Sequence, residues 1–174
     1  MKKIKAIGVL LNTSDIKKAR HFYETVLGLQ VLNDIGHMVE FEMFSLWSGY
    51  DKLVSGEGFT SQPQGTKIKM TPKPNNWQLY FEVKDFDYMV EKLKSTEGIE
   101  LLSDITEYNW GQRSSRFYDY DGHIFELSES IHHVIKRFLT QGLTVEEVSK
   151  RLGFPVEYVQ EHLNSDTEHT LVTE

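Results

Sequence analysis

The pattern of apolar and polar positions repeats along the chain at an offset of 70 residues. Residues 8–32 align with residues 78–102 without a gap, and Asp15 then matches Asp85. Each copy reads as an apolar strand, an aspartate that can cap a helix, an amphipathic helix ended by glycine, and a second strand. The repeat predicts two equivalent modules, and clefts between modules are favoured ligand sites.

Two further strands follow the repeat in each half. Residues 37–44 and 45–53 are rich in apolar and aromatic side chains and are predicted to be strands. Residues 113–119 and 123–128 alternate as paired strands around a turn at residues 120–122, where glycine tolerates positive φ. Each module is therefore predicted to be a βαβββ unit, and the fold class to be α+β.

A stretch rich in glycine and proline, residues 55–74, separates the two halves. A loop of this length is either a functional lid or a plain linker, and the sequence favours neither. It divides a domain spanning residues 1–130 into modules of about residues 1–54 and 75–130.

The pattern changes to helical after this domain. An apolar stripe at helical spacing is followed by a capping box, Thr144 with Glu147, and by Pro155 at the start of a third helix. We expect a helical appendage resembling a helix-turn-helix over residues 131–163 and a flexible tail over residues 164–174. We expect the barrel or a second subunit to cover the stripe, which comprises Ile131, Val134, Ile135, Phe138 and Leu139.

Composition narrows the function classes. The 174 residues include no cysteine, which excludes disulfides, a thiolate nucleophile and cysteine-ligated metal centres. The net charge of −7 disfavours nucleic acid as a partner, and the segment from residue 131 onward contains only four basic residues but seven acidic ones. No apolar run is long enough to cross a membrane, so we expect no membrane partner and a cytoplasmic location.

Three segments carry a resemblance to a known family. They are SDIKKARHFYETVLGL, VKDFDYMVEKL and the closing WGQR…FYDYDGHIFEL. Together with the paired modules they resemble the vicinal oxygen chelate superfamily of glyoxalase I, bleomycin-resistance proteins, extradiol dioxygenases and fosfomycin-resistance enzymes. The resemblance covers roughly residues 1–130. It implies two βαβββ modules that form a cup for a small organic molecule.

The enzymes of this superfamily place a metal ligand on the first and the last strand of each module. Carried over by position, these ligands fall on Gly8, Ser45, Gln78 and Glu126. The resemblance implies one divalent ion (Ni, Zn, Mn or Fe), but Gly8 has no side chain and Ser45 is a poor ligand. The sequence therefore departs from the enzyme pattern, and Glu40 or Glu42 on the neighbouring strand would have to substitute.

Strand parity predicts, independently of the family, which side chains face the cup. In the segment from Trp77 to Val83, Leu79 and Phe81 should pack on the helix, while Gln78 and Tyr80 face the open side. Aromatic side chains mixed with convergent polar groups are typical of a small-molecule pocket. The candidate ligand-binding residues are Asn12, Glu40, Glu42, Trp47, Gln78, Tyr80, Trp110, Arg116, Tyr118 and Glu126.

Two of these residues have equally plain structural interpretations. Glu126 is either a metal ligand or a strand residue that is solvated or paired with Arg116 or Arg113. Trp110 either lines the mouth of the pocket or closes the core.

The leading hypothesis is a protein of the glyoxalase/bleomycin-resistance type that binds a small organic molecule as a homodimer. One alternative is a divalent-metal-dependent lyase, isomerase or dioxygenase, in which Glu126 or Glu42 is a ligand or base. A second alternative is a ligand-sensing regulator that acts through the C-terminal helices. No spacing in the sequence decides whether the chain is an enzyme.

Overall fold

The computed structural model describes residues 8–55 and 73–164. These residues form two compact units. Of the described residues, the first unit comprises 8–55, 73–74 and 120–122, and the second comprises 75–119 and 123–164. Each unit contains one four-stranded sheet. Within the described residues, no helix has the length and apolar character needed to span a membrane.

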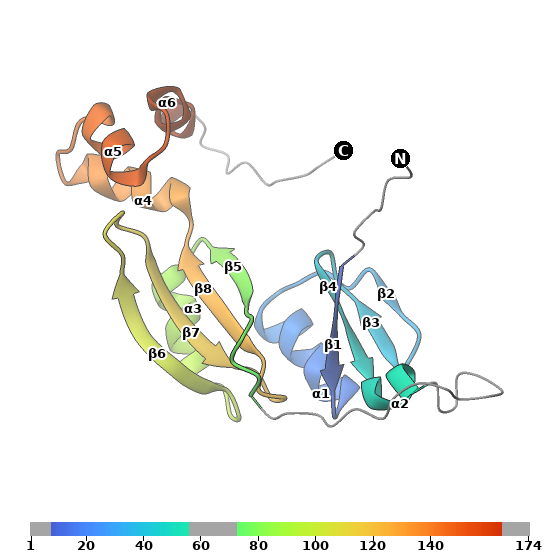
Figure 1. The fold of residues 1–174 in the computed structure, drawn as a ribbon. Coiled ribbons are helices and arrows are strands. Elements are labelled where there is room, and N and C mark those ends of the chain that lie inside the picture. The colour runs from blue at the N-terminus through green and yellow to red at the C-terminus, as the bar shows by residue number, and fades with distance from the viewer. Residues whose placement is uncertain (1–7, 56–72, 165–174) are drawn as a thin grey trace, which may run out of the picture. The chain divides into compact units, whose positions relative to one another are not determined.

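The first unit contains one βαβββ module followed by a short helix (Figure 1). Its sheet has the order β1-β4-β3-β2, in which β1 is parallel to β4 and the other pairs are antiparallel. The elements are β1 (Val9–Thr13), α1 (Ile16–His21) with a π-helical turn (Phe22–Val26), β2 (Asn33–Asp34), β3 (Met38–Glu40), β4 (Phe44–Ser48) and α2 (Tyr50–Ser55).

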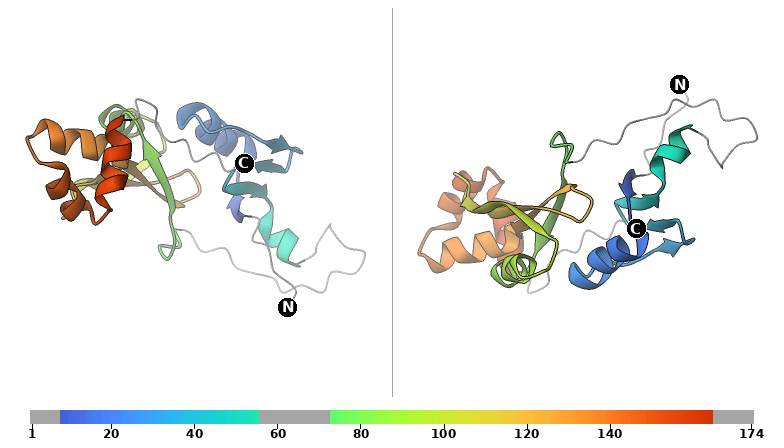
Figure 2. Two further views of the ribbon diagram at one scale, coloured as in Figure 1. Left: turned by 90° about the horizontal axis from the view of Figure 1, so that it is seen from above. Right: turned by 90° about the horizontal axis from the view of Figure 1, so that it is seen from below.

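The second unit repeats this topology and adds three helices. Its sheet has the order β5-β8-β7-β6, again with a parallel pair, β5 and β8, at one edge. Figures 1 and 2 show α3 lying along one face of this sheet. The elements are β5 (Leu79–Val83), α3 (Phe86–Lys94), β6 (Glu100–Glu107), β7 (Arg113–Tyr118), β8 (Ile124–Glu129), α4 (Ile131–Thr140), α5 (Val145–Leu152) and α6 (Val156–Asn164).

The 70-residue repeat of the sequence is confirmed in the bounds of the elements. Strand β5 begins and ends 70 residues after β1, and the helices α1 and α3 begin at Ile16 and Phe86. Gly28 and Gly98 both have positive φ, 79° and 83°, where other residues are strained. The predicted pair of βαβββ modules is therefore confirmed.

Burial follows the predicted strand parity in both sheets. In the first unit Leu11, Val39 and Leu46 are buried together with Phe22 and Tyr23 of the helical segment. In the second unit the buried apolar residues of the sheet and helix are Phe86, Val90, Leu93, Phe117, Phe125 and Leu127. One face of each sheet therefore packs on its helix, and the opposite face carries the polar strand positions.

The C-terminal helices form an apolar core of their own. Val134, Ile135 and Phe138 of α4 are buried against Val148 of α5 and Val159 of α6. Helices α5 and α6 therefore cover most of the stripe, which the sequence did not predict, and Phe138 also lies against Gly111 of the β6–β7 connection. The capping box of Thr144 and Glu147 and the start of α6 after Pro155 are as predicted.

Three local predictions differ from the structure. The strand predicted at residues 45–53 ends at Ser48, and Tyr50–Ser55 is a helix, because Gly49 turns the chain with φ of 77°. The second strand predicted for the first copy of the repeat is limited to the two residues of β2. Asp15 caps α1 through its side chain, whereas Asp85 precedes α3 without a side-chain capping bond.

Candidate functional site

The polar face of the second sheet centres on the carboxylate of Glu126. Glu126 is 4% exposed, and its carboxylate forms an ion pair with Nη2 of Arg116 on the neighbouring strand β7. Gln78 donates to it from Nε2 at 2.9 Å, and Ser128 donates from its hydroxyl at 3.0 Å. A buried carboxylate requires such compensation, because its desolvation is costly.

The strand register brings this group together. Arg116 is opposite Glu126 on β7, and Tyr80 is opposite Glu126 on β5. Residues directly opposite each other in neighbouring strands point to the same face. Three of the predicted residues therefore meet by strand pairing alone, and Gln78 joins them from the position just before β5.

Arg116 extends the network to a tyrosine that sequence reasoning missed. Its Nη2 donates to the hydroxyl of Tyr108 at 2.7 Å, and its Nε donates to Oε1 of Gln78 at 3.1 Å. Tyr108 stacks on Trp110, with ring centroids 4.3 Å apart and planes at 11°. Trp110 is 42% exposed and lies in the connection between β6 and β7, so it does not close the core.

Gln112 connects the aromatic residues of this face and was also missed. It is buried, accepts a hydrogen bond from Nε1 of Trp110 at 3.2 Å, and donates to the hydroxyl of Tyr80 at 3.0 Å. The sequence signal was its place in the segment WGQR, one residue from the module's closing hairpin. Tyr80 in turn donates to Glu82 at 3.1 Å.

Burial, followed by the negative charge of Glu82, raises the pKa of the Tyr80 hydroxyl above its usual value of 10.0. The same two causes raise the pKa of Tyr158 on α6. Both hydroxyls therefore remain protonated donors at neutral pH. The face thus has a guanidinium at Arg116, the carboxylate of Glu82, and exposed aromatic rings.

Tyr118, a further predicted residue, points to the same face as Arg116 but is 5% exposed, and its hydroxyl donates to Asn75 at 2.7 Å.

The predicted residues of the first unit do not form a comparable cluster. Asn12 accepts a hydrogen bond from the backbone of Tyr50 at 3.2 Å, at the start of α2. Glu40 and Trp47 are half-buried on the polar face of the sheet, and Trp47 lies against the ring of His37.

Glu42 is not on a strand, contrary to the prediction. Strand β3 ends at Glu40, and the chain reverses between Phe41 and Phe44, whose backbone atoms bond at 2.8 Å. Glu42 lies exposed in this turn, so it does not share the alternation of the strand.

The register also fixes the position of Ser45, one of the four positions implied by the family resemblance. Ser45 is opposite Leu10, as Glu126 is opposite Tyr80, and Tyr80 matches Leu10 in the 70-residue repeat. Ser45 therefore stands where Glu126 stands in the other module. Within the described residues, no group of three or more histidine, aspartate or glutamate side chains is placed to hold a metal ion.

The donor set does not fit the metal centre that the resemblance implies. Gly8 contributes no side chain, and Ser45 contributes only a hydroxyl, which is a poor ligand for the divalent ions concerned. Gln78 and Glu126 are both bonded to the guanidinium of Arg116, whose positive charge would repel a metal ion.

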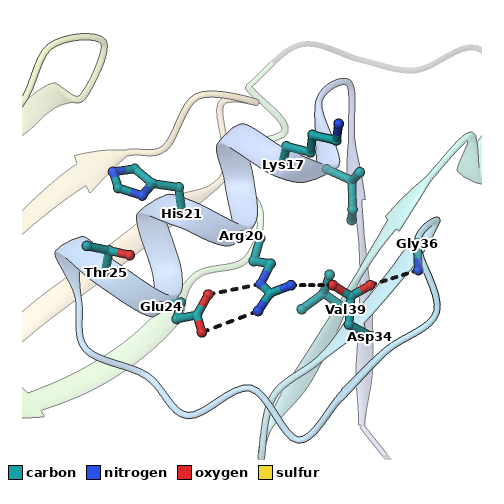
Figure 3. Close-up of a pocket in the computed structure, with 9 residues that line it drawn as sticks. Lys17, Arg20, His21, Glu24, Thr25, Asp34, Gly36 and Val39 are labelled. Carbon is teal, nitrogen blue, oxygen red and sulfur yellow. Dashed lines mark hydrogen bonds and ion pairs between the residues drawn. The ribbon is translucent and has the colours of Figure 1, made fainter.

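A hollow lies elsewhere, on the first unit, as Figure 3 shows. It has a volume of about 420 Å³ and lies between α1 and the hairpin of β2 and β3. Arg20 crosses it between Glu24 and Asp34. The hydrogen bond and charge of Glu24, together with Asp34, raise the pKa of Arg20. Glu24 and Asp34 thus pair with the charged group of Arg20. None of the predicted site residues lines the hollow.

Comparison with known proteins places the chain in a family. Residues 6–132 match the model of the glyoxalase-like domain, so the chain belongs to that family and, with it, to the vicinal oxygen chelate superfamily. No curated protein matches the chain in sequence.

Solved structures agree with the fold. A protein of unknown function from Agrobacterium tumefaciens is 31% identical, with a TM-score of 0.61 over 75% of this chain and 98% of that chain. A glyoxalase-related enzyme from Fulvimarina pelagi is 17% identical, with a TM-score of 0.56 over 73% and 89%. A lactoylglutathione lyase from Agrobacterium tumefaciens is 22% identical, with a TM-score of 0.52 over 74% and 96%. These last two identities support the fold alone.

Proposed function

We propose that the chain binds a small organic molecule on the polar face of the sheet formed by β5, β8, β7 and β6. The observation that carries the proposal is the buried ion pair of Glu126 and Arg116, which lies on the face opposite α3. Exposed aromatic residues flank it, with Tyr80 51% and Trp110 42% exposed. Convergent polar groups beside aromatic surface are the usual composition of a ligand site.

Stability alone gives a weak reason for this arrangement. Replacing a buried ion pair with apolar residues of similar volume is often neutral or stabilising, because both charges lose their water. Ordinary packing would therefore favour an apolar residue at the buried position of Glu126. Binding of a ligand to these polar side chains would explain why the chain has them.

The main alternative, a metal-dependent lyase, isomerase or dioxygenase, has less support from the side chains. It needs oxygen or nitrogen donors that are free to bind an ion. Gln78 and Glu126 are the best donors at the family positions, and Arg116 contacts both. No step through a metal ion is therefore proposed for this chain.

A ligand screen monitored by backbone amide NMR tests the proposal. We expect neutral, cationic or anionic fragments to shift amides of β5, β7 and β8 in a saturable manner. Tyr80→Ala should weaken binding about tenfold, the loss expected for one aromatic contact. Tyr88→Ala is the matched control, because Tyr88 is 65% exposed on α3, which covers the opposite face.

Two outcomes would contradict the proposed function. One is a complete screen in which no fragment shifts the amides of the polar face. The other is an equal loss of affinity in Tyr80→Ala and Tyr88→Ala, because only Tyr80 belongs to that face.

We also propose that the chain forms a homodimer. Strand β6 is at the edge of its sheet and exposes Leu101, Leu102 and Ile105, at 38%, 43% and 40%. An exposed edge strand with large apolar side chains is a ready surface for pairing with another chain. Light scattering at micromolar concentration should give twice the mass of the chain, and a monomeric mass would exclude the dimer.

A further inference from the structure

The guanidinium of Arg116 ties together the two side chains that the family resemblance assigns to a metal ion. Its Nε donates to Gln78 at 3.1 Å, and its Nη2 pairs with the carboxylate of Glu126. Gln78 completes the triangle by donating its own Nε2 to Glu126 at 2.9 Å. Each member of the triangle is thus bonded to both of the others.

This triangle supplies the positive charge that the buried carboxylate needs. Glu126 is 4% exposed, and a carboxylate at that burial is stable only beside a cation or several donors. Arg116 is 29% exposed at its side chain, so the guanidinium lies between the buried carboxylate and solvent. A metal ion at this position would have to displace a cation that already neutralises Glu126.

One amino group of the guanidinium is not used in these hydrogen bonds. Nη1 of Arg116 forms no hydrogen bond with any of the described residues, while Nε and Nη2 both do. An arginine amino group carries two N–H donors and no acceptor, so it recognises acceptor oxygens and prefers anionic ones.

We propose that Arg116 takes the place of the metal ion in this chain and that its Nη1 holds a carboxylate of the ligand. The inference rests on the proposed function and specifies the ligand class as a small aromatic carboxylic acid. The aromatic part follows from the neighbours of the triangle. Tyr80 is opposite Glu126 in the sheet, and Gln112 joins the hydroxyl of Tyr80 to the indole of Trp110.

The charge of the face orients such a ligand. Glu82 accepts the hydrogen bond of the Tyr80 hydroxyl and repels a carboxylate, whereas Arg116 attracts it. The carboxylate therefore points to Arg116, and the ring lies toward Tyr80 and Trp110. The net charge of −7 gives no long-range attraction for an anion, so recognition depends on these local contacts.

The test is a titration of the full chain with benzoate, followed by NMR of the arginine side chains. The Nε signal of Arg116 is identified as the one lost in Arg116→Gln. We expect benzoate to shift this signal in a saturable manner. Benzamide, which has the same shape without the charge, should bind about tenfold more weakly, because a hydrogen bond to a charged group is replaced by one to a neutral group.

Three variants separate the role of Arg116 from a general effect of charge or folding. Arg116→Gln should abolish the benzoate-induced shifts of the backbone amides of β7 and β8, and Arg116→Lys, which keeps a cation beside Glu126, should retain weakened shifts. Arg113→Gln removes the same charge from the same strand, but Arg113 bonds to Asp87 of α3 on the opposite face. This control should bind benzoate as the unmodified chain does.

A metal titration addresses the other half of the inference. Substoichiometric Mn²⁺ broadens NMR signals close to its binding site, and the side-chain amide of Gln78 is the reporter. We expect this signal to remain sharp in the unmodified chain. Selective broadening of the Gln78 signal that disappears in Glu126→Ala would overturn the replacement of the metal by Arg116.

The failure of this inference differs from the failure of the proposed function. Fragments that bind the polar face with no preference for a carboxylate, or that leave the Arg116 signal unmoved, overturn the inference alone. Benzoate that binds equally well to Arg116→Gln, with the variant folded by its amide spectrum, also overturns it. A polar face that no fragment shifts overturns both.

Discussion

Replacing Glu129 with alanine should destabilise the second unit far more than a comparable change on its surface. Glu129 is 3% exposed at the end of β8 and accepts hydrogen bonds from Nε and Nη2 of both Arg113 and Arg137, the shortest at 2.9 Å. Arg137 belongs to α4, so this carboxylate joins the sheet to the C-terminal helices. Its removal leaves two guanidinium groups without their shared anion.

The magnitude follows from the burial of the partners. Removing one partner of a buried ion pair costs roughly 3–5 kcal/mol. Arg113 and Arg137 are each 24% exposed and keep a second carboxylate, Asp87 and Glu107 respectively. We therefore expect the lower end of the range, a loss of about 3 kcal/mol in the free energy of unfolding.

The effect should depend on pH with a definite sign. Burial alone would raise the pKa of Glu129, but the hydrogen bonds and charges of Arg137 and Arg113 outweigh it and lower the pKa from 4.5. A carboxylate whose pKa is lower in the folded state stabilises the protein above the unfolded pKa. That contribution is lost as the pH falls through the folded value. The difference in the free energy of unfolding between the unmodified chain and Glu129→Ala should be at its maximum at pH 7 and shrink below about pH 4.5.

Urea unfolding followed by circular dichroism, at a series of pH values from 7 to 3, measures this difference. Glu91→Ala is the control, because Glu91 pairs with Lys94 at a position that is 72% exposed, and such pairs contribute about 0–1 kcal/mol. A loss in Glu129→Ala no larger than that of Glu91→Ala would refute the reasoning. So would a difference that stays constant over the whole pH series.

Three further predictions follow from other parts of the chain. In urea unfolding, Gly111→Ala should lower the free energy of unfolding several times more than Gly142→Ala does. Both glycines have positive φ, but only at Gly111 would the added carbon meet the ring of Phe138, at 1.9 Å; equal losses would argue against a steric cause. The purified protein should contain well under one equivalent of Ni, Zn, Mn or Fe by elemental analysis, and stoichiometric metal lost in Glu126→Ala would favour the metal enzyme. Duplex DNA should show no salt-sensitive binding in the micromolar range by fluorescence anisotropy, whereas clear binding that weakens with salt would favour the regulator.

The fold was predictable because its signals are local and occur twice. Each copy has a strand of alternating parity, a helix of regular spacing and a glycine at the end, and the two copies support each other. The wrong predictions of secondary structure lie where a single residue determines the path of the chain. Gly49 ends β4 and allows a helix, although the segment that follows contains residues common in strands.

The site was predictable as far as strand parity reaches. Alternation placed Gln78, Tyr80, Arg116 and Glu126 on one face, and pairing with Arg116 was one of several interpretations of Glu126. Tyr108 and Gln112 were missed because they lie at the end of β6 and in the connection that follows, where no alternation indicates direction. The covering of the α4 stripe was misjudged for a different reason, since contacts among three short helices depend on their packing angles and not on any one pattern.

The matched register of the two sheets restricts how point mutations could give this chain new chemistry. A centre with four ligands would need donors at Gly8 and Ser45 and the release of Glu126 from Arg116. Losing Arg116 first leaves a buried carboxylate without its cation, at a cost of roughly 3–5 kcal/mol, and gaining one donor first brings no benefit. Each single step is thus neutral or harmful. The salt bridge therefore opposes the stepwise gain of a four-ligand centre, because no single substitution is favourable by itself.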